Sequence, residues 1–222
     1  MKCALIIPSY NAAASIGTLL ERTARVHPTD ATIVVDDGST DRTPEIARAF
    51  QVRVISHPVN RGKGAALTTG FDAALTGGYD AVITMDSDLQ HQPEDIPRFI
   101  DAYASTHRDI IIGSRLHALK GMPYHRRLSN LMTTRLVRMR TRAPIEDSQS
   151  GFRFIHARVL EQVRTVSAGF EAETEFIIRA AQRGFTFGAI PIDTVYAGEK
   201  SSMTHWHTTK RFISVLLTDF QP

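Results

Sequence analysis

The feature that most constrains the fold is a regular alternation of short apolar runs with segments of helical periodicity. The runs are rich in β-branched residues and end in polar or turn residues, as buried parallel strands do; they lie at 5–7, 33–35, 52–55, 81–85 and 110–112. Apolar residues recur at helical spacing between them, in 12–26, 44–50, 61–76 and 93–106. This order predicts an α/β fold with a doubly wound, mostly parallel sheet flanked by helices.

The second half of the chain is less regular. We expect a basic helix over 123–140, a helix over 171–183, strands near 185–197 and a last helix over 206–218. No apolar run approaches the length of a membrane-spanning helix, and the N-terminal run is too short for a signal peptide. Cys3 is the only cysteine, so no intrachain disulfide can form. We therefore expect a single domain, 1–222, in the cytoplasm.

The basic residues are unevenly distributed. Lysine and arginine number 26 against 23 acidic residues, a net charge of +3 that does not indicate a nucleic-acid partner. No acidic residue occurs between Asp109 and Glu146, where the basic residues are Arg115, Lys120, Arg126, Arg127, Arg135, Arg138, Arg140 and Arg142. Such a block attracts phosphate on a nucleotide, on a lipid head group or at an anionic membrane surface, or it forms a solvated helix face.

The expected helix at 123–140 also carries apolar residues among its arginines. They are Leu128, Leu131, Met132, Leu136, Val137 and Met139. A helix of this composition can lie in the bilayer interface, with its arginines near anionic head groups. It can equally pack its apolar side on the protein's own core.

The strongest local motif follows the run at 81–85. Asp86 and Asp88 are spaced so that they project to the same side of an extended chain, and Gln90 follows them. Carboxylate and amide oxygens are hard ligands that suit Mg²⁺ or Mn²⁺. The alternative is a strand that ends in solvated aspartates before a helix.

Other polar loops follow the predicted strands, where ligands bind in open α/β sheets. Residues 36–41 contain Asp37, whose carboxylate can accept hydrogen bonds from ribose or a base, or can belong to a helix-capping turn. Lys63 stands between two glycines and can border a phosphate, but the Walker A pattern is absent. Asp147 can act as a base or pair with Arg153.

Taken together, these pieces resemble the family 2 glycosyltransferases, in particular the dolichol- or polyprenol-phosphate sugar synthases. The matching segments occur in family order at 8–11, 34–41, 60–64, 85–90, 113–115, 150–153 and 198–201. The resemblance implies a GT-A fold with a nucleotide-sugar-binding half, 1–115, and a smaller acceptor-binding half, 116–222. It also implies inverting transfer of a sugar from a nucleotide diphosphate donor.

The resemblance and the local motifs described above together give candidate residues for each role. The donor-binding candidates are Pro8, Tyr10, Asn11, Val35, Asp37, Lys63, Met85, Asp86, Ser87, Asp88, Arg115 and Ser201. The metal ligands would be Asp86, Asp88 and Gln90. The acceptor-binding candidates are Arg115, Arg126, Arg127 and Ser129. The catalytic candidates are Asp88, Asp147, Arg126, Arg127 and Lys200.

The resulting expectation is a metal-dependent transfer from a donor of the GDP-mannose or UDP-glucose type to a polyprenyl or dolichyl phosphate. The enzyme would attach peripherally to the cytoplasmic face of the membrane. A phosphate acceptor is already an anion and needs no strong base, whereas a sugar hydroxyl needs one, for which Asp147 is the candidate. Three alternatives stay open: a family 2 enzyme acting on a glycan hydroxyl, a nucleotidyltransferase, and a non-catalytic nucleotide-sugar-binding module.

Overall fold

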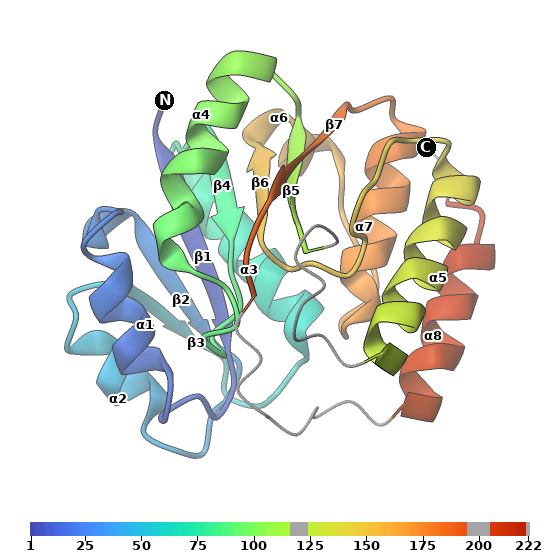
Figure 1. Ribbon diagram of the computed structural model, residues 1–222. Helices are drawn as coiled ribbons and strands as arrows, with labels where there is room; N and C mark the ends of the chain where they lie inside the picture. The colour runs from blue at the N-terminus through green and yellow to red at the C-terminus, as the bar shows by residue number, and fades with distance from the viewer. Residues whose placement is uncertain (116–123, 195–204, 221–222) are drawn as a thin grey trace.

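A computed structural model describes residues 1–115, 124–194 and 205–220. It confirms an α/β fold built on a seven-stranded sheet of order β3-β2-β1-β4-β6-β5-β7 (Figure 1). The strands are β1 Cys3–Ser9, β2 Thr32–Asp36, β3 Arg53–Ser56, β4 Ala81–Thr84, β5 Ile110–Ser114, β6 Arg153–His156 and β7 Phe187–Pro191. Most pairs are parallel, and only β6 runs antiparallel to its neighbours β4 and β5.

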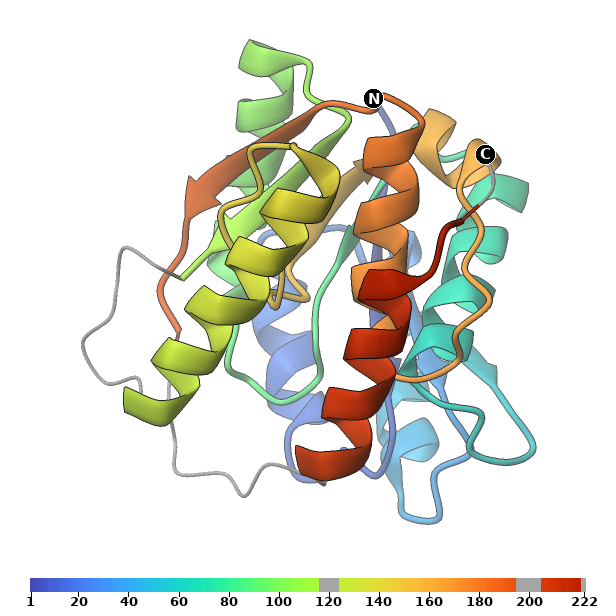
Figure 2. The same cartoon turned by 90° about the vertical axis from the view of Figure 1, so that its right-hand side faces the viewer.

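Helices cover both faces of the sheet. They are α1 Ile16–Thr23, α2 Thr43–Arg48, α3 Lys63–Thr76, α4 Ile96–Thr106, α5 Tyr124–Thr141, α6 Ala157–Gln162, α7 Glu171–Gln182 and α8 His205–Leu217, with short 3₁₀ turns η1 Thr29–Ala31 and η2 Pro93–Asp95. One apolar core lies between the sheet and α1, α2 and α4, and a second lies beneath α3, α5, α6 and α7. The helices α5, α7 and α8 pack side by side on that second face (Figure 2).

The strand β6 and the helix α6 were not expected from the sequence. Only Phe154 and Ile155 are apolar in β6, and the flanking Arg153 and His156 hide its pattern. The strand is nevertheless buried, because it is inserted between β4 and β5. Its position brings the segment 147–152 to the end of β4, which the order of elements alone did not reveal.

The expectation of fully buried strands is confirmed for β1, β2, β4 and β5 but is wrong for β3. That strand is partly exposed because it forms the edge of the sheet. At the centre, α3 packs very closely on β1: a Cβ at Gly70 would lie 2.5 Å from Cγ2 of Ile6. Within the described part of the chain, no helix combines the length and the apolar character needed to cross a bilayer.

Candidate active site at the carboxyl edge of the sheet

The loops after β1 and β2 lie against each other because these strands are parallel neighbours. The backbone N–H of Asn11 donates to Oγ of Ser39 (2.9 Å), and its side-chain oxygen accepts from the backbone N–H of Thr40 (2.9 Å). Asn11 has a left-handed φ of 49°, which asparagine tolerates better than most residues. It therefore ties the two loops together, while the neighbouring Tyr10 is exposed at their rim.

Asp37 lies deeper, at the start of the second loop. Its carboxylate accepts the backbone N–H groups of Arg61 (2.9 Å) and Gly62 (2.7 Å) and contacts Nδ1 of His57 (2.7 Å). These contacts fix the loop that leads into α3. The side chains of three other donor candidates, Pro8, Val35 and Met85, are buried in the sheet. The role of Asp37 in holding a nucleoside stays a prediction.

Asp86, Asp88 and Gln90 follow β4 and are partly exposed, as is Ser87. The backbone N–H of Gln90 donates to Oδ1 of Asp88 at 3.0 Å. Leu89, between them, has a φ of 63°, a strained conformation for a bulky side chain and one that concentrates at functional sites. The chain thus accepts backbone strain where the two carboxylates are presented.

This donor set fits a hard divalent ion. Two carboxylates and an amide supply only oxygen, which is what Mg²⁺ and Mn²⁺ prefer. Among the described residues, no group of three or more His, Cys, Asp or Glu side chains gathers into a metal-binding cluster. Remaining ligands would come from water and substrate phosphate, as is usual for Mg²⁺ bound by one or two carboxylates.

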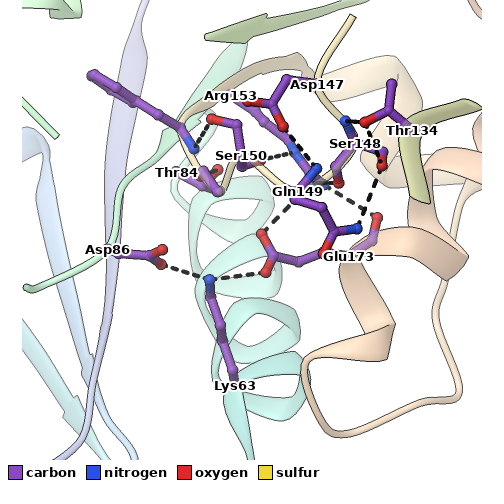
Figure 3. A network of polar contacts seen from close by, with 12 residues as sticks. Lys63, Thr84, Asp86, Thr134, Asp147, Ser148, Gln149, Ser150, Arg153 and Glu173 are labelled. Carbon is purple, nitrogen blue, oxygen red and sulfur yellow. Dashed lines mark hydrogen bonds and ion pairs between the residues drawn. The ribbon is translucent and has the colours of Figure 1, made fainter. Parts of the chain in front are cut away.

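Lys63 joins Asp86 to Glu173, a residue at the start of α7 (Figure 3). Its Nζ lies 2.6 Å from Oδ1 of Asp86 and 2.8 Å from Oε2 of Glu173. Burial alone would raise the pKa of Asp86, but the Lys63 ammonium outweighs it and holds that pKa below its usual value. Burial likewise opposes the charge of Lys63, yet the two carboxylates keep its pKa above the usual range.

Arg153 anchors the other side of this network. The guanidinium is buried and donates to the backbone oxygens of Ser150 (2.7 Å), Ser148 (3.1 Å) and Glu173 (3.2 Å). Its Nη2 also lies 3.8 Å from Oε1 of Glu173. The segment 148–151 is thereby held against the end of β4, where the hydroxyl of Thr84 donates to the oxygen of Gly151 at 2.7 Å.

Crowding favours glycine at position 151. A Cβ there would lie 2.8 Å from Oδ2 of Asp86 and 3.1 Å from Nζ of Lys63. Both atoms are tips of flexible side chains, so an added methyl group would displace them rather than unfold the strand. Two residues of the motif at 150–153 thus have a structural explanation. Gly151 leaves space for the side chains of Asp86 and Lys63, and Arg153 holds Glu173 by a hydrogen bond to its backbone oxygen.

Asp147 forms a two-pronged ion pair with Arg115. Its Oδ2 accepts a hydrogen bond from Nε of Arg115 at 2.7 Å, and its Oδ1 accepts one from Nη2 at 3.0 Å. The carboxylate is 0% exposed. Burial would raise its pKa, but the hydrogen bonds and charge of Arg115 hold that pKa below its ordinary value. Arg115, not Arg153, is thus the arginine that pairs with Asp147.

His91 follows the two carboxylates and is buried against Phe152, with ring centroids 5.2 Å apart. Burial lowers the pKa of His91 to about 4, so its ring is neutral at pH 7. Its Nδ1 has no hydrogen-bond partner within the described ranges. The ring is therefore a neutral, buried wall of the site.

Comparison with known proteins identifies the chain. The sequence model of the family described as glycosyl transferase family 2 matches residues 4–164. The chain belongs to this family. It is a glycosyltransferase, which removes the non-catalytic module and the nucleotidyltransferase from the alternatives.

Several curated relatives match over most of their length. The UDP-N-acetylglucosamine–dolichyl-phosphate N-acetylglucosaminyltransferase of Methanococcus voltae is 31% identical over 216 residues, which cover 86% of this chain and 85% of the relative. The dolichyl-phosphate hexose transferase of Haloferax volcanii is 32% identical, covering 85% and 81%. The polyprenol monophosphomannose synthase of Mycolicibacterium smegmatis is 30% identical, covering 85% and 75%.

The fold also matches solved structures of the GT-A type. A glucosyl-3-phosphoglycerate synthase from Mycobacterium tuberculosis, in complex with Mn²⁺, UDP and phosphoglyceric acid, superposes with a TM-score of 0.79 at 21% identity. The match covers 97% of this chain and 77% of the other. At this identity the likeness supports the fold alone, and it confirms the predicted GT-A class.

The remaining site candidates of the glycosyltransferase lie on α5 or beyond it. Arg127 and Ser129 are exposed on the first turns of α5. The side chain of Arg126 and all of Lys200 and Ser201 lie outside the described residues.

Two residues of the site were missed in the sequence. Glu173 and His91 carry no motif of their own, although His91 directly follows the segment of Asp86, Asp88 and Gln90, and Glu173 belongs to an acidic cluster that opens α7. The acidic cluster was the only signal for Glu173, because its contact with Lys63 joins residues far apart in the sequence.

Proposed function

We propose that this glycosyltransferase moves a sugar from a nucleoside-diphosphate sugar to a polyprenyl phosphate with inversion. The observation that carries the proposal is the pair of carboxylates, Asp86 and Asp88, at the end of β4 and in the same site as the cation Lys63. The basic helix α5 begins toward the same carboxyl edge of the sheet, in the lower half of Figure 1. Relatives named for sugar transfer to dolichyl or polyprenol phosphate support this choice of acceptor.

Residues 1–115 would bind the donor and residues 116–222 most of the acceptor. The loops of Tyr10, Asn11 and Asp37 would hold the nucleoside, with the backbone at Pro8, Val35 and Met85 as their floor. Lys63, Ser87 and Arg115 would face the diphosphate. Lys200 and Ser201 would belong to a loop that covers it.

Asp86, Asp88 and Gln90 would hold Mg²⁺ or Mn²⁺. Such an ion neutralises the charge that develops on a departing nucleoside diphosphate. Neutralising that charge is the main task of the donor site, because the diphosphate is a poor leaving group while it carries its full charge. Lys63 and Lys200 would contribute further positive charge on the same side.

The acceptor phosphate would meet arginines. Arg115, Arg126 and Arg127 would bind and orient it through paired hydrogen bonds, with Ser129 beside them. The buried ion pair with Asp147 holds the guanidinium of Arg115 in place. A phosphate is ionised at pH 7 and attacks without a general base. A hydroxyl acceptor would need such a base, and a wholly buried carboxylate with a lowered pKa is poorly suited to that role.

Helix α5 would also touch the membrane that contains the acceptor. Leu131, Met132 and Leu136 are exposed, and Met139 is 69% exposed. Arginines lie between them in the sequence, and α8, which contacts α5, also exposes two apolar side chains, Ile213 and Leu217. A mixed apolar and cationic surface matches an anionic bilayer, and attachment would be peripheral, on the cytoplasmic face.

Vesicle binding tests this surface. The double variant Leu131→Glu, Met132→Glu should lose flotation with vesicles that contain phosphatidylglycerol. Val166→Glu adds the same kind of charge at another exposed apolar residue, one that is 84% exposed, and should float like the wild type. Equal flotation of all three proteins would contradict membrane docking through α5.

The function itself is tested by product analysis. The protein is incubated with UDP-glucose, UDP-N-acetylglucosamine or GDP-mannose, Mn²⁺ and a polyprenyl phosphate, and the lipid is analysed by mass spectrometry. We expect one hexose or N-acetylhexosamine added to the phosphate. Arg127→Ala should raise KM for the lipid far more than KM for the donor. Transfer only to a glycan hydroxyl, or equal effects on both KM values, would contradict the proposed acceptor.

A further inference from the structure

The contact between Lys63 and Asp86 places a protein cation against a carboxylate assigned to the metal. Lys63 Nζ lies 2.6 Å from Oδ1 of Asp86, so the ammonium already neutralises part of the charge that would attract an ion. Lys63 is held there from a second side, because Glu173 binds the same Nζ at 2.8 Å. Figure 3 shows the lysine between the two carboxylates.

The position of Glu173 is itself fixed by the fold. Arg153 donates to its backbone oxygen at 3.2 Å and lies 3.8 Å from its carboxylate. Glu173 approaches Lys63 from α7, whereas Asp86 approaches from the end of β4. Two elements from opposite halves of the chain therefore share one ammonium group.

We propose that Lys63 is an internal counter-cation that couples binding of the divalent ion to binding of the donor diphosphate, with Glu173 as its positioning residue. Without a donor, the ammonium occupies Asp86 and weakens its attraction for an ion. A diphosphate offers Lys63 another anion, so Asp86 becomes available as the donor arrives. By linkage, the ion strengthens diphosphate binding by the same factor. This inference rests on the proposed metal-dependent transfer.

Substitutions of Lys63 and of Glu173 should then have opposite effects on the ion. Lys63→Met removes the competing cation and leaves two carboxylates facing the vacated position. We expect Mn²⁺ alone to bind more tightly by about tenfold, a modest value for one charge contact near a protein surface. In Glu173→Gln the Lys63 ammonium has Asp86 as its only carboxylate partner of the two. Mn²⁺ without nucleotide should therefore bind more weakly.

Matched controls separate this contact from a general change in charge. Arg61→Met removes a positive charge from an exposed side chain in the loop just before Lys63. Glu171→Gln removes a negative charge from the same turn of α7 as Glu173, but the Glu171 carboxylate lies 3.7 Å from Arg211. Both controls should leave Mn²⁺ affinity within about twofold of the wild type.

The experiment is a Mn²⁺ titration of the full chain by electron paramagnetic resonance, with and without UDP or GDP. In the wild type, the nucleotide should tighten Mn²⁺ binding strongly, and in Lys63→Met this coupling should fall by about tenfold. A thermal melt checks that each variant folds. If Lys63→Met does not fold, the isosteric variant Glu173→Gln still tests the proposal.

The outcomes distinguish the two proposals. Wild-type protein that binds no Mn²⁺ even with nucleotide would overturn the proposed metal site and this inference with it. Mn²⁺ binding that is tight with nucleotide, but unchanged in Lys63→Met and Glu173→Gln, would overturn the inference alone. Shifts of the same sign in those two variants would also overturn it.

Discussion

Replacing Asp147 with asparagine should destabilise the protein strongly, because the change removes a buried charge and keeps the side chain's shape. The carboxylate is 0% exposed, and Arg115, its partner, has a side chain only 12% exposed. A neutral amide in place of the carboxylate would leave the guanidinium, which has little access to solvent, without its two-pronged carboxylate partner. Breaking one partner of a buried ion pair costs about 3–5 kcal/mol.

That cost is a large part of the total stability expected for a single domain, about 5–15 kcal/mol. In a chain of 222 residues each kcal/mol shifts the melting temperature by about 2–4 °C, so Asp147→Asn should melt at least about 6 °C lower. Urea unfolding and calorimetry measure both values. Asp219→Asn is the control, because Asp219 pairs with Arg140 but is 96% exposed, and it should melt like the wild type.

The same variant separates a positioning role from general-base catalysis. If Asp147 only holds Arg115, stability falls and the KM for the acceptor rises. An Asp147→Asn protein as stable as the wild type, with turnover nearly abolished, would show that Asp147 acts as a base and not as a support for Arg115.

Three further predictions follow from buried contacts. Glu175 accepts two backbone N–H groups in the segment 166–167 at 2.9 Å; burial would raise its pKa, but these hydrogen bonds hold it below the ordinary 4.5. The ionised Glu175 therefore stabilises the fold fully above about pH 4.5, and this stabilisation is lost as the pH falls through the lowered pKa of the folded protein. In urea unfolding, the difference in stability between the wild type and Glu175→Gln should shrink below pH 4.5. Gly151→Ala should melt close to the wild type but bind Mn²⁺ more weakly in a titration, because its methyl group displaces Asp86. Gly70→Ala should lose about 1–3 kcal/mol in urea unfolding, because its Cβ meets a methyl group of the buried Ile6 at 2.5 Å.

Much of the fold could be predicted because the patterns of strands and helices are local. Each of the runs near 5–7, 33–35, 81–85 and 110–112 became a buried strand, because β-branched residues between polar turns leave few alternatives. The sequence pattern does not predict strand β6, because the strand is short and carries Arg153 and His156 at its ends. Only the tertiary insertion between β4 and β5 explains why such residues form a strand.

The site was predictable where the chemistry is contiguous. Asp86, Asp88 and Gln90 indicate hard-ligand chemistry through spacing alone, and the structure presents them after β4 as expected. The pairing of Lys63 with Glu173 could not be predicted, because it joins α3 to α7 across more than a hundred residues. The partner of Asp147 could not be predicted either. Arg153 is the nearer arginine in the sequence, but the order of strands in the sheet brings Arg115 to Asp147 instead.

In the proposed reaction, two carboxylates at the end of β4 hold a divalent ion on the donor diphosphate. Calorimetric titration with UDP and with GDP can test this role in three conditions: with Mn²⁺, with chelator, and with the variant Asp88→Ala in Mn²⁺. We predict tight binding of one nucleotide in Mn²⁺, and loss of that binding both in chelator and in a folded Asp88→Ala protein. Binding of equal strength under all three conditions would show that these carboxylates hold no ion on the diphosphate.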